Sequence, residues 1–318
     1  GRPLFGAVEL TALRLPTLLD RIWPFGVLFG AMFAFWRLNR SQELVAIRAA
    51  GISAWQFLAP AGLVAVLLGA FVVTSLNPLG AALAARYERL QAQRTGDGTA
   101  QMSVFPGGIW LKQSRDGETL LVHAQRMRAE PVVELAPVTV FVYDRDHTYR
   151  GRIDAPRAVL ATAAWVLDDA RRSDDAGLNR PIGRYRIPTD LDPATITRSF
   201  RDPATLSFWE LPGYIALIDT LGFSARAHRL HFQSLLATPL FFAAMLLTGV
   251  TFTLRFVRTG LARMLPLGLV AGFTLFILVD VLRALGVSGQ LPTVLAAWGP
   301  GVVALMLAGA ALFQLEDG

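Results

Sequence analysis

Residues 54–76 read AWQFLAPAGLVAVLLGAFVVTSL and contain no charged side chain. The uncharged region around them extends from Ala49 to Ala85. A helix that crosses the hydrocarbon layer of a bilayer needs about 20 predominantly apolar residues, and the cores of soluble proteins rarely contain uncharged runs of this length. The stretch therefore predicts a transmembrane helix rather than a buried helix of a soluble domain.

The rest of the chain contains four more segments of the same kind. We predict spans near residues 16–36, 232–254, 264–283 and 292–314, because each lies within or beside a long uncharged run. The composition agrees, since 53% of the 318 residues are hydrophobic and 17% are charged, whereas soluble domains average about 25% charged residues. The sequence thus predicts a polytopic α-helical membrane protein with five spans.

Most of the charge lies between the second and third spans. Residues 86–206 carry 18 basic and 16 acidic side chains, which is 34 of the 54 charges in the chain. Short β-prone runs alternate there with turn-forming residues, and Val138–Tyr143 (VTVFVY) has the strongest β propensity. We expect further strands at 108–112, 119–123, 158–168 and 182–187. The pattern predicts an inserted all-β domain of the sandwich or roll type.

These boundaries divide the chain into an N-terminal transmembrane part, a β-domain, an amphipathic linker helix and a C-terminal transmembrane part with three spans, at residues 1–85, 86–206, 207–228 and 229–318. Four apolar side chains of the linker fall at helical spacing on one face: Tyr214, Leu217, Ile218 and Leu221. We expect this face to lie along the membrane surface.

Arginines predict the orientation of the chain in the bilayer. The link between the first two spans carries Arg37, Arg40 and Arg48 against Glu43, and the link between the third and fourth spans is also basic. Loops rich in arginine and lysine stay in the cytoplasm, so both links and the C-terminus are predicted to be cytoplasmic. The β-domain and the N-terminal stretch then lie outside. We therefore expect one further span upstream of Gly1, which gives six spans in the intact protein.

Several classes of function are excluded by residue types. Lys112 is the only lysine and follows Leu111, so the chain lacks the Gly-Lys-Ser/Thr triplet of a P-loop. It has no cysteine, its four histidines show no metal-binding spacing, and the net charge of residues 86–206 is only +2. We predict no catalytic residue, no metal, no cofactor and no nucleic-acid partner. Any ATP hydrolysis that drives the protein must occur on another chain.

Residues 39–51 (NRSQELVAIRAAG) predict a short helix within the first cytoplasmic link. Asn39 is a suitable N-cap, with Gln42 three residues later in a capping-box position. Gly51 is a suitable residue to end the helix.

This helix is predicted to be amphipathic. Leu44, Ile47 and Ala50 share an apolar face, and Glu43 and Arg48 lie beside it. The pattern supports two interpretations equally: the helix binds a soluble partner, or it rests on the lipid surface.

The segment RSQELV at 40–45, continued by RAAG at 48–51, resembles the signature of the LptF/LptG (YjgP/YjgQ-type) family of lipopolysaccharide export permeases. The resemblance covers nearly the whole chain and includes Asn77-Pro78, the FWELP motif at 208–212 and the segment His228–Pro239. The closing residues, Ala296-Ala297-Trp298 and Leu315–Gly318, are most similar to the LptG branch of α-proteobacteria.

The resemblance implies a multi-pass permease subunit of an ABC transporter in the bacterial inner membrane. Such a permease extracts lipopolysaccharide and passes it to a periplasmic bridge toward the outer membrane. Family members have six spans and a periplasmic β-jellyroll between the third and fourth, so the five spans here correspond to the family's second to sixth. The implied partners are a dimer of an LptB-like ATPase, the paralogous permease (LptF or LptG), LptC and the periplasmic bridge.

The resemblance also implies two sets of site residues. The helix at 39–51 is the ATPase-coupling element, Glu43 is expected to pair with a basic residue of the ATPase, and the candidate coupling residues are Glu43, Leu44, Ile47, Arg48, Ala50 and Gly51. Arginines near the outer surface are candidate contacts for the phosphates of the lipid head group, although each also suits an interfacial anchor: Arg21, Arg86, Arg89, Arg226 and Arg229.

Two other classes of membrane protein stay open at this point. An ion-driven secondary transporter needs ionisable residues deep in its spans, and Asp280 is an acid near a span interior, with Arg283 one turn away as its expected partner. A mechanotransmitting permease of the MacB or FtsX kind usually has four spans, which disagrees with the predicted five.

Overall fold

The structure is a computed structural model. It describes residues 2–95, 100–105, 108–115, 118–128, 132–144, 148–161, 164–173, 179–189, 201–220, 223–256 and 261–317. The chain forms two compact units. The membrane unit comprises residues 1–87, 203–212 and 226–318, and the β-unit comprises residues 88–202 and 213–225.

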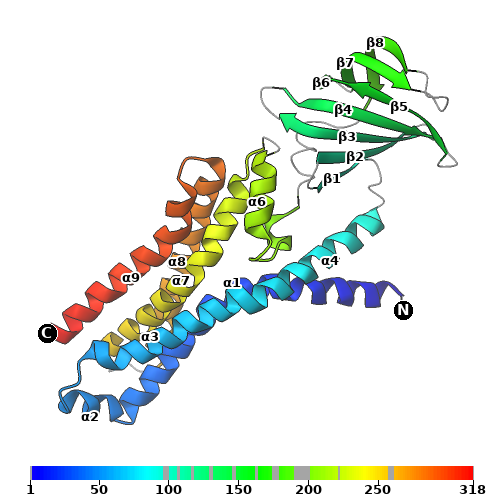
Figure 1. Cartoon of the computed structure of the whole chain (residues 1–318). Coiled ribbons are helices and arrows are strands. Elements are labelled where there is room, and N and C mark those ends of the chain that lie inside the picture. The colour runs from blue at the N-terminus through cyan, green and yellow to red at the C-terminus, as the bar shows by residue number, and fades with distance from the viewer. Residues whose placement is uncertain are drawn as a thin grey trace. The chain divides into compact units, whose positions relative to one another are not determined.

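Long helices build the membrane unit (Figure 1). They are α1 (Arg2–Arg40), α3 (Ala54–Phe71), α7 (Arg226–Phe256), α8 (Leu261–Ser288) and α9 (Thr293–Asp317), and α3 continues through the π-helical turn η1 (Val72–Leu76) into α4 (Asn77–Thr95). Among the described residues, five segments are long and apolar enough to cross a bilayer: Leu18–Arg40, Ala54–Gln91, Arg226–Arg255, Met264–Ser288 and Thr293–Gln314. The five predicted spans are confirmed.

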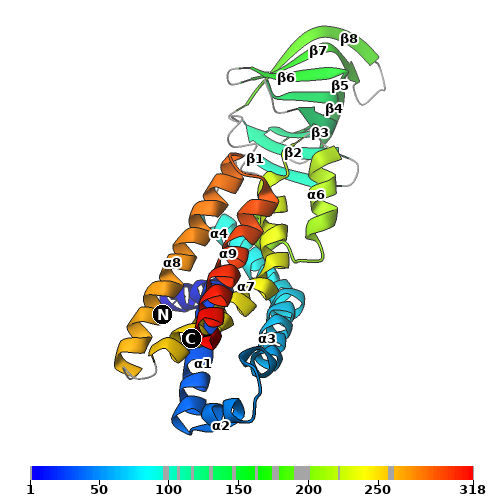
Figure 2. The same ribbon diagram turned by 90° about the vertical axis from the view of Figure 1, so that its left-hand side faces the viewer.

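Helix α7 is the centre of this unit. It contacts α1, α3, α8 and α9, and Figure 2 shows it between α3 and the pair α8 and α9. Half of the residues in its most apolar window are buried, against 17–28% in the other four spans. The outer helices therefore present most of their apolar surface away from the protein, as lipid-facing helices do.

Small residues allow the helices to approach closely. A Cβ added at Gly69 would lie 2.6 Å from the Cα of Pro239, which brings α3 against α7. A Cβ at Gly249 would lie 2.7 Å from the carbonyl oxygen of Leu28, which does the same for α7 and α1. Helices in a bilayer gain no hydrophobic free energy by leaving lipid, so their association depends on such close packing.

The predicted cytoplasmic helix is shorter than expected. It is α2 (Glu43–Ala49), because α1 continues to Arg40 and Gln42 adopts a left-handed conformation with φ of 62° between the two helices. The predicted cap at Asn39 is therefore wrong. The carbonyl of Gln42 accepts the first bond of α2, from the N–H of Ala46 at 3.0 Å. Gly51, with φ of +80°, follows the helix as predicted.

The described residues of the β-unit form an antiparallel sheet of eight strands. They are β1 (Ala100–Phe105), β2 (Gly108–Arg115), β3 (Glu118–Arg128), β4 (Glu134–Tyr143), β5 (Tyr149–Ala155), β6 (Arg157–Ala161), β7 (Ala164–Ser173) and β8 (Asn179–Pro188). Strands β5 and β6 are separated only by Pro156. Both pair with β4, and the register does not shift between them; the same holds for their pairing with β7. Strands β5 and β6 thus act as one bent strand in a continuous antiparallel meander.

The inserted all-β domain predicted from residues 86–206 is confirmed, with corrections to its strands. The single strand expected at 158–168 consists of the ends of two paired strands, β6 and β7. Strands β1 and β5 were not predicted. Strand β5 reads YRGRIDA, and its two exposed arginines hide the alternation of buried Gly151, Ile153 and Ala155.

Helix α6 (Leu211–Thr220) covers the core of the β-unit. Ile218 is buried there, Tyr214 and Leu217 pack against the same core, and Trp165, Leu135 and Leu167 are fully buried within it. The expectation that this apolar face lies along the membrane surface is wrong, because the sheet occupies it. The helix is also shorter than residues 207–228, since a turn occupies 208–210; Leu221 lies outside the described residues.

Candidate functional site

A cavity of about 220 Å³ lies inside the membrane unit. Its walls come from α1, η1, the start of α4, α7, α8 and α9, so helices from both halves of the sequence form it. Its lining residues on the last three helices lie toward the start of α7, the end of α8 and the start of α9.

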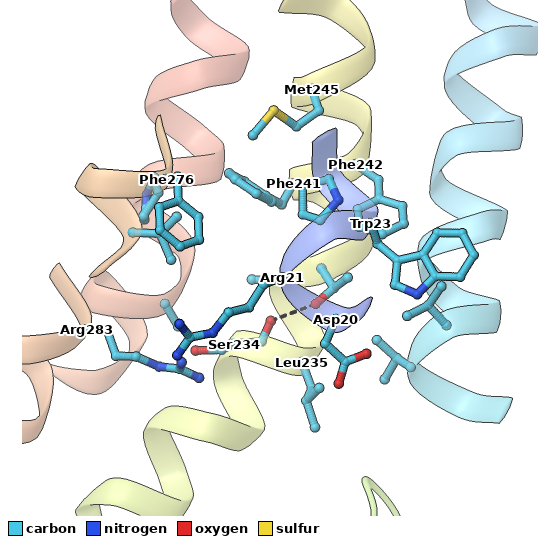
Figure 3. A pocket seen from close by; sticks show the side chains of 18 of the residues that line it. Asp20, Arg21, Trp23, Ser234, Leu235, Phe241, Phe242, Met245, Phe276 and Arg283 are labelled. Atoms are coloured by element: carbon cyan, nitrogen blue, oxygen red, sulfur yellow. Dashed lines mark hydrogen bonds between the residues drawn. The ribbon is translucent and has the colours of Figure 1, made fainter. Parts of the chain in front are cut away.

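The lining of the cavity is divided into an apolar and a polar part. The apolar part includes Phe241, Phe242, Met245 and Phe276. Figure 3 shows these side chains at one end of the cavity and the charged groups at the other end. The polar lining residues are Asp20, Arg21, Asn77, His231, Ser234, Thr238, Asp280 and Arg283. Such a division suits a ligand with an apolar body and a charged head.

Two guanidinium groups converge in the polar part. Arg21 extends from α1 and Arg283 from α8, and Figure 3 shows their side chains meeting beside Ser234, whereas Asp20 points away from Arg21. Within the described part of the chain, neither arginine forms an ion pair with a carboxylate. Guanidinium groups bind phosphate through paired hydrogen bonds. The pair is therefore a candidate site for a phosphate group.

The expected ion pair between Asp280 and Arg283 is absent among the described side chains. Both residues instead line the cavity from α8. The position of Arg283 at the end of an apolar span could have marked it as a candidate ligand contact. The sequence instead predicted that it pairs with Asp280.

The other predicted head-group arginines do not gather at the cavity. Arg86 and Arg89 are exposed on α4, and Arg229 is exposed on α7. The guanidinium of Arg226 lies against Gly289, in the turn between α8 and α9. Of the five predicted arginines, only Arg21 lines this cavity.

The predicted coupling residues lie at the opposite end of the unit, on α2 and just beyond it. Leu44 is buried in a core cluster with Phe35 and Leu58, so it fixes α2 to α1 and α3. Ile47 is half-buried, and Ala50 and Gly51 are exposed. Glu43 is exposed, and the Ser41 hydroxyl donates to its Oε1 at 2.8 Å. The side chain of Arg48 lies outside the described positions. Among the described side chains of α2, Leu44 is therefore buried against the spans, whereas Glu43 and Ala46 are exposed.

Basic residues mark this end of the unit. Arg37 and Arg40 occupy the last turn of α1, and Arg255 occupies the last turn of α7. The guanidinium of Arg40 lies 5.3 Å from the ring centre of Trp36. An aromatic ring beside a cation is typical of the membrane–water boundary, and the clustered arginines agree with the predicted cytoplasmic location of this end.

Comparison with known proteins identifies the family. The sequence profile of the family described as "Lipopolysaccharide export system permease LptF/LptG" matches residues 1–314. The chain belongs to the LptF/LptG family. The lipopolysaccharide export system permease protein LptG of Escherichia coli K12 is 24% identical over 307 residues, which are 93% of this chain and 82% of that protein. LptG of Haemophilus influenzae is 23% identical over 312 residues, which are 96% of this chain and 84% of that protein.

Membership in the LptF/LptG family explains the arrangement of the chain. The profile match and the five apolar helices mark it as a multi-pass permease subunit, and the inserted sheet agrees with that assignment. They favour a lipopolysaccharide export permease over an ion-driven transporter or a MacB-like or FtsX-like permease. Two of the motifs meet in the structure: the backbone N–H of Phe208 donates to Oδ1 of Asn77, and the indole N–H of Trp209 donates to the carbonyl of Thr74, three residues before Asn77.

Proposed function

We propose that this chain is the membrane-spanning permease of a lipopolysaccharide exporter and forms part of the path by which the lipid leaves the bacterial inner membrane. The observation that carries the proposal is the family match over residues 1–314. The five spans and the inserted β-unit of the chain agree with that role. In this arrangement the β-unit is periplasmic and α2 is cytoplasmic.

The cavity of the membrane unit suits a part of such a lipid. Lipopolysaccharide has several acyl chains and an anionic head group. The apolar wall of Phe241, Phe276 and Met245 offers a surface for an acyl chain, and Arg21 with Arg283 offers cations for a phosphate. Arg226 and Arg229, at the same end of α7, and Arg86 and Arg89 on α4 remain candidates for weaker attraction of the head group.

We further propose that the chain acts with other subunits. The P-loop is absent from its sequence, so ATP hydrolysis occurs on an LptB-like ATPase dimer bound at the cytoplasmic end. The paralogous permease completes the cavity, and LptC and a periplasmic bridge accept the lipid beyond the β-unit. The large lipid-facing surfaces of α8 and α9 leave room for a second permease.

Helix α2 is the proposed contact for the ATPase. Leu44 anchors it to the spans, and its exposed surface carries Glu43. Closure of the ATPase pair would press on α2, and Leu44 would transmit that displacement to α1 and α3. An ion pair between Glu43 and a basic residue of the ATPase would align α2 on the ATPase surface.

Replacement of Glu43 tests this coupling. Removal of one partner from a buried ion pair costs on the order of 3–5 kcal/mol, so Glu43→Ala should weaken ATPase binding or separate ATP hydrolysis from lipid release. Glu118→Ala, at an exposed acid of the β-unit, is the matched control. Co-purification and ATPase stimulation measure the outcome, and unchanged values for Glu43→Ala would remove the assignment of α2.

The function itself is tested by reconstitution. Proteoliposomes that contain the full-length permease, its paralogue and the ATPase should release lipopolysaccharide to an added periplasmic acceptor when ATP is supplied. An ATPase variant that binds but does not hydrolyse ATP provides the control. Release that is independent of ATP, or export of another lipid in preference to lipopolysaccharide, would contradict the proposal.

A further inference from the structure

The second span contains a break that the chain must repair. The helix runs from Ala54 to Thr95 through η1, yet Pro78 lies inside it. Proline has no N–H, so the carbonyl of Thr74, one turn earlier, loses the donor that a regular α-helix provides. The helix widens here into a π-turn, in which the N–H of Asn77 donates to the carbonyl of Val72. A backbone carbonyl without a donor is costly at membrane depth.

The segment that leads into α6 supplies two bonds to this break. The indole Nε1–H of Trp209 donates to the carbonyl of Thr74 at 3.2 Å. The backbone N–H of Phe208 donates to Oδ1 of Asn77 at 2.8 Å, and Asn77 is buried, with 7% of its surface exposed. The carbonyl that Pro78 deprives of a donor therefore receives one from a residue 135 positions away.

This donor segment is itself held in place. Glu210 accepts hydrogen bonds from the N–H and the hydroxyl of Ser207, at 3.0 and 2.8 Å. The ring of Phe208 stacks on Phe232 of α7, with ring centres 5.4 Å apart. A turn that is closed by its own hydrogen bonds and packed on α7 thus presents Trp209 to the second span.

The break forms part of the cavity wall, because Val72, Val73 and Asn77 all line it. We propose that Trp209 and Asn77 are positioning residues that hold the Pro78-broken end of the second span and so fix the shape of this wall during lipid transport. Trp209 acts through the Thr74 carbonyl and does not itself line the cavity. The role in transport rests on the proposed export function, whereas the stabilisation of the second span by Trp209 does not depend on that function.

The rival explanation is that Trp209 is an anchor in the membrane interface. Trp209 has 65% of its surface exposed, and tryptophan is frequent at bilayer surfaces because it combines an apolar ring with an N–H donor. The two explanations differ in one respect: an anchor serves the lipid, whereas a positioning residue serves the Thr74 carbonyl. If the helix itself supplies a donor to the Thr74 carbonyl, this compensates for the loss of a positioning residue but not for the loss of a membrane anchor.

Three variants separate these roles. Trp209→Phe keeps an aromatic ring and removes the N–H. Pro78→Ala returns a backbone N–H one turn after Thr74, and the double variant combines both changes. Trp298→Phe is the matched control, because it removes another indole donor, to Gln233 Oε1 at 3.0 Å, which has no connection to Thr74.

Transport and hydrogen exchange provide two readouts. Loss of one hydrogen bond changes an equilibrium by about threefold to tenfold. We expect Trp209→Phe to slow ATP-driven lipopolysaccharide release by about that factor, and to speed amide exchange in residues 72–81 similarly. In the Pro78→Ala background the Trp209→Phe change should alter either quantity by less than about twofold, while the effect of Trp298→Phe should be the same in both backgrounds.

The outcomes are distinguishable. If Trp209→Phe has no effect on exchange at 72–81, or if its effect persists in the Pro78→Ala background, the positioning role is refuted and the anchor remains. If exchange behaves as expected but the wild-type exporter releases no lipopolysaccharide, the proposed function fails while the repair of the break stands. If exchange responds but release does not, the bond does not position the cavity wall for transport, and the inference is overturned.

Discussion

The two units expose their apolar side chains very differently. Among the described residues, the exposed large hydrophobic side chains of the β-unit are Val132, Tyr149 and Tyr185. The membrane unit exposes many, such as Met306 at 69% and Val64 at 64%. A protein in water would aggregate with such a surface, so this difference shows that the two units fold in different solvents.

The units also differ in what fills their cores. The β-unit buries large side chains from alternate strand positions, with Trp165 and Leu167 at its centre. The membrane unit relies on glycines such as Gly69 and Gly249, where an added Cβ would contact the neighbouring backbone. Burial from water stabilises the first, whereas close contact between helices stabilises the second.

The largest expected effect is in the core of the β-unit. Trp165→Ala removes a side chain with 2% exposure, and such a change costs about 3–5 kcal/mol. We expect protease cleavage within residues 100–188 at a lower temperature while the spans stay protected. Equal loss of both units would show that they do not fold separately.

The lipid-facing surface provides the next test. Met306→Arg places a charge near the middle of α9, where a central arginine costs about 2.5–3.5 kcal/mol for insertion. Val132→Arg, at an exposed position of the β-unit, should change stability by less than about 0.5 kcal/mol. Membrane-integrated yield and thermal stability measure the two variants. Similar behaviour of both would contradict the assignment of different solvents.

The arginine pair of the cavity should have a smaller effect. Loss of one charge-assisted hydrogen bond corresponds to about 1.5–3 kcal/mol, so Arg21→Ala or Arg283→Ala should weaken lipopolysaccharide binding by about tenfold or more. Binding of lipid A that lacks its phosphates should be unaffected by either change. Photo-crosslinking yield in membranes measures binding, and equal losses with both lipids would place the ligand phosphate elsewhere.

The smallest effect concerns pH and the β-unit alone. Hydrogen bonds from Arg157 and Arg184 hold the pKa of Asp168 below its usual range. Its contribution to stability is therefore present above the ordinary pKa of an aspartate and is lost as the pH falls through the lowered value. Asp168→Asn should melt slightly earlier than wild type at neutral pH and equally at strongly acidic pH. A difference that grows toward acidic pH would reverse this sign.

The sequence predicted those parts of the fold that depend on local composition. Uncharged runs such as Ala49–Ala85 located the spans, and Val138–Tyr143 located a central strand. The end of α2 followed from Gly51, which adopts the positive φ that glycine permits. The start of α2 did not, because α1 extends past Asn39 and Gln42 makes the turn.

Features that depend on distant contacts could not be predicted. The apolar face of α6 looked the same for a lipid surface as for a sheet, and only the fold places Ile218 in the β-unit core. The meeting of Arg21 and Arg283 requires α1 to pack beside α8. The partner of the Thr74 carbonyl is likewise set by the fold, although Pro78 already indicated that a donor was missing.

Cysteine labelling tests the proposed orientation of the chain in the bilayer most directly. The sequence has no cysteine, so Gln42→Cys beside α2 and Gln125→Cys on β3, both at exposed positions, each provide a single thiol. In spheroplasts, a membrane-impermeant maleimide should label Gln125→Cys at once and Gln42→Cys only after lysis. Labelling of both from outside, or of Gln42→Cys alone, would contradict the export function proposed here.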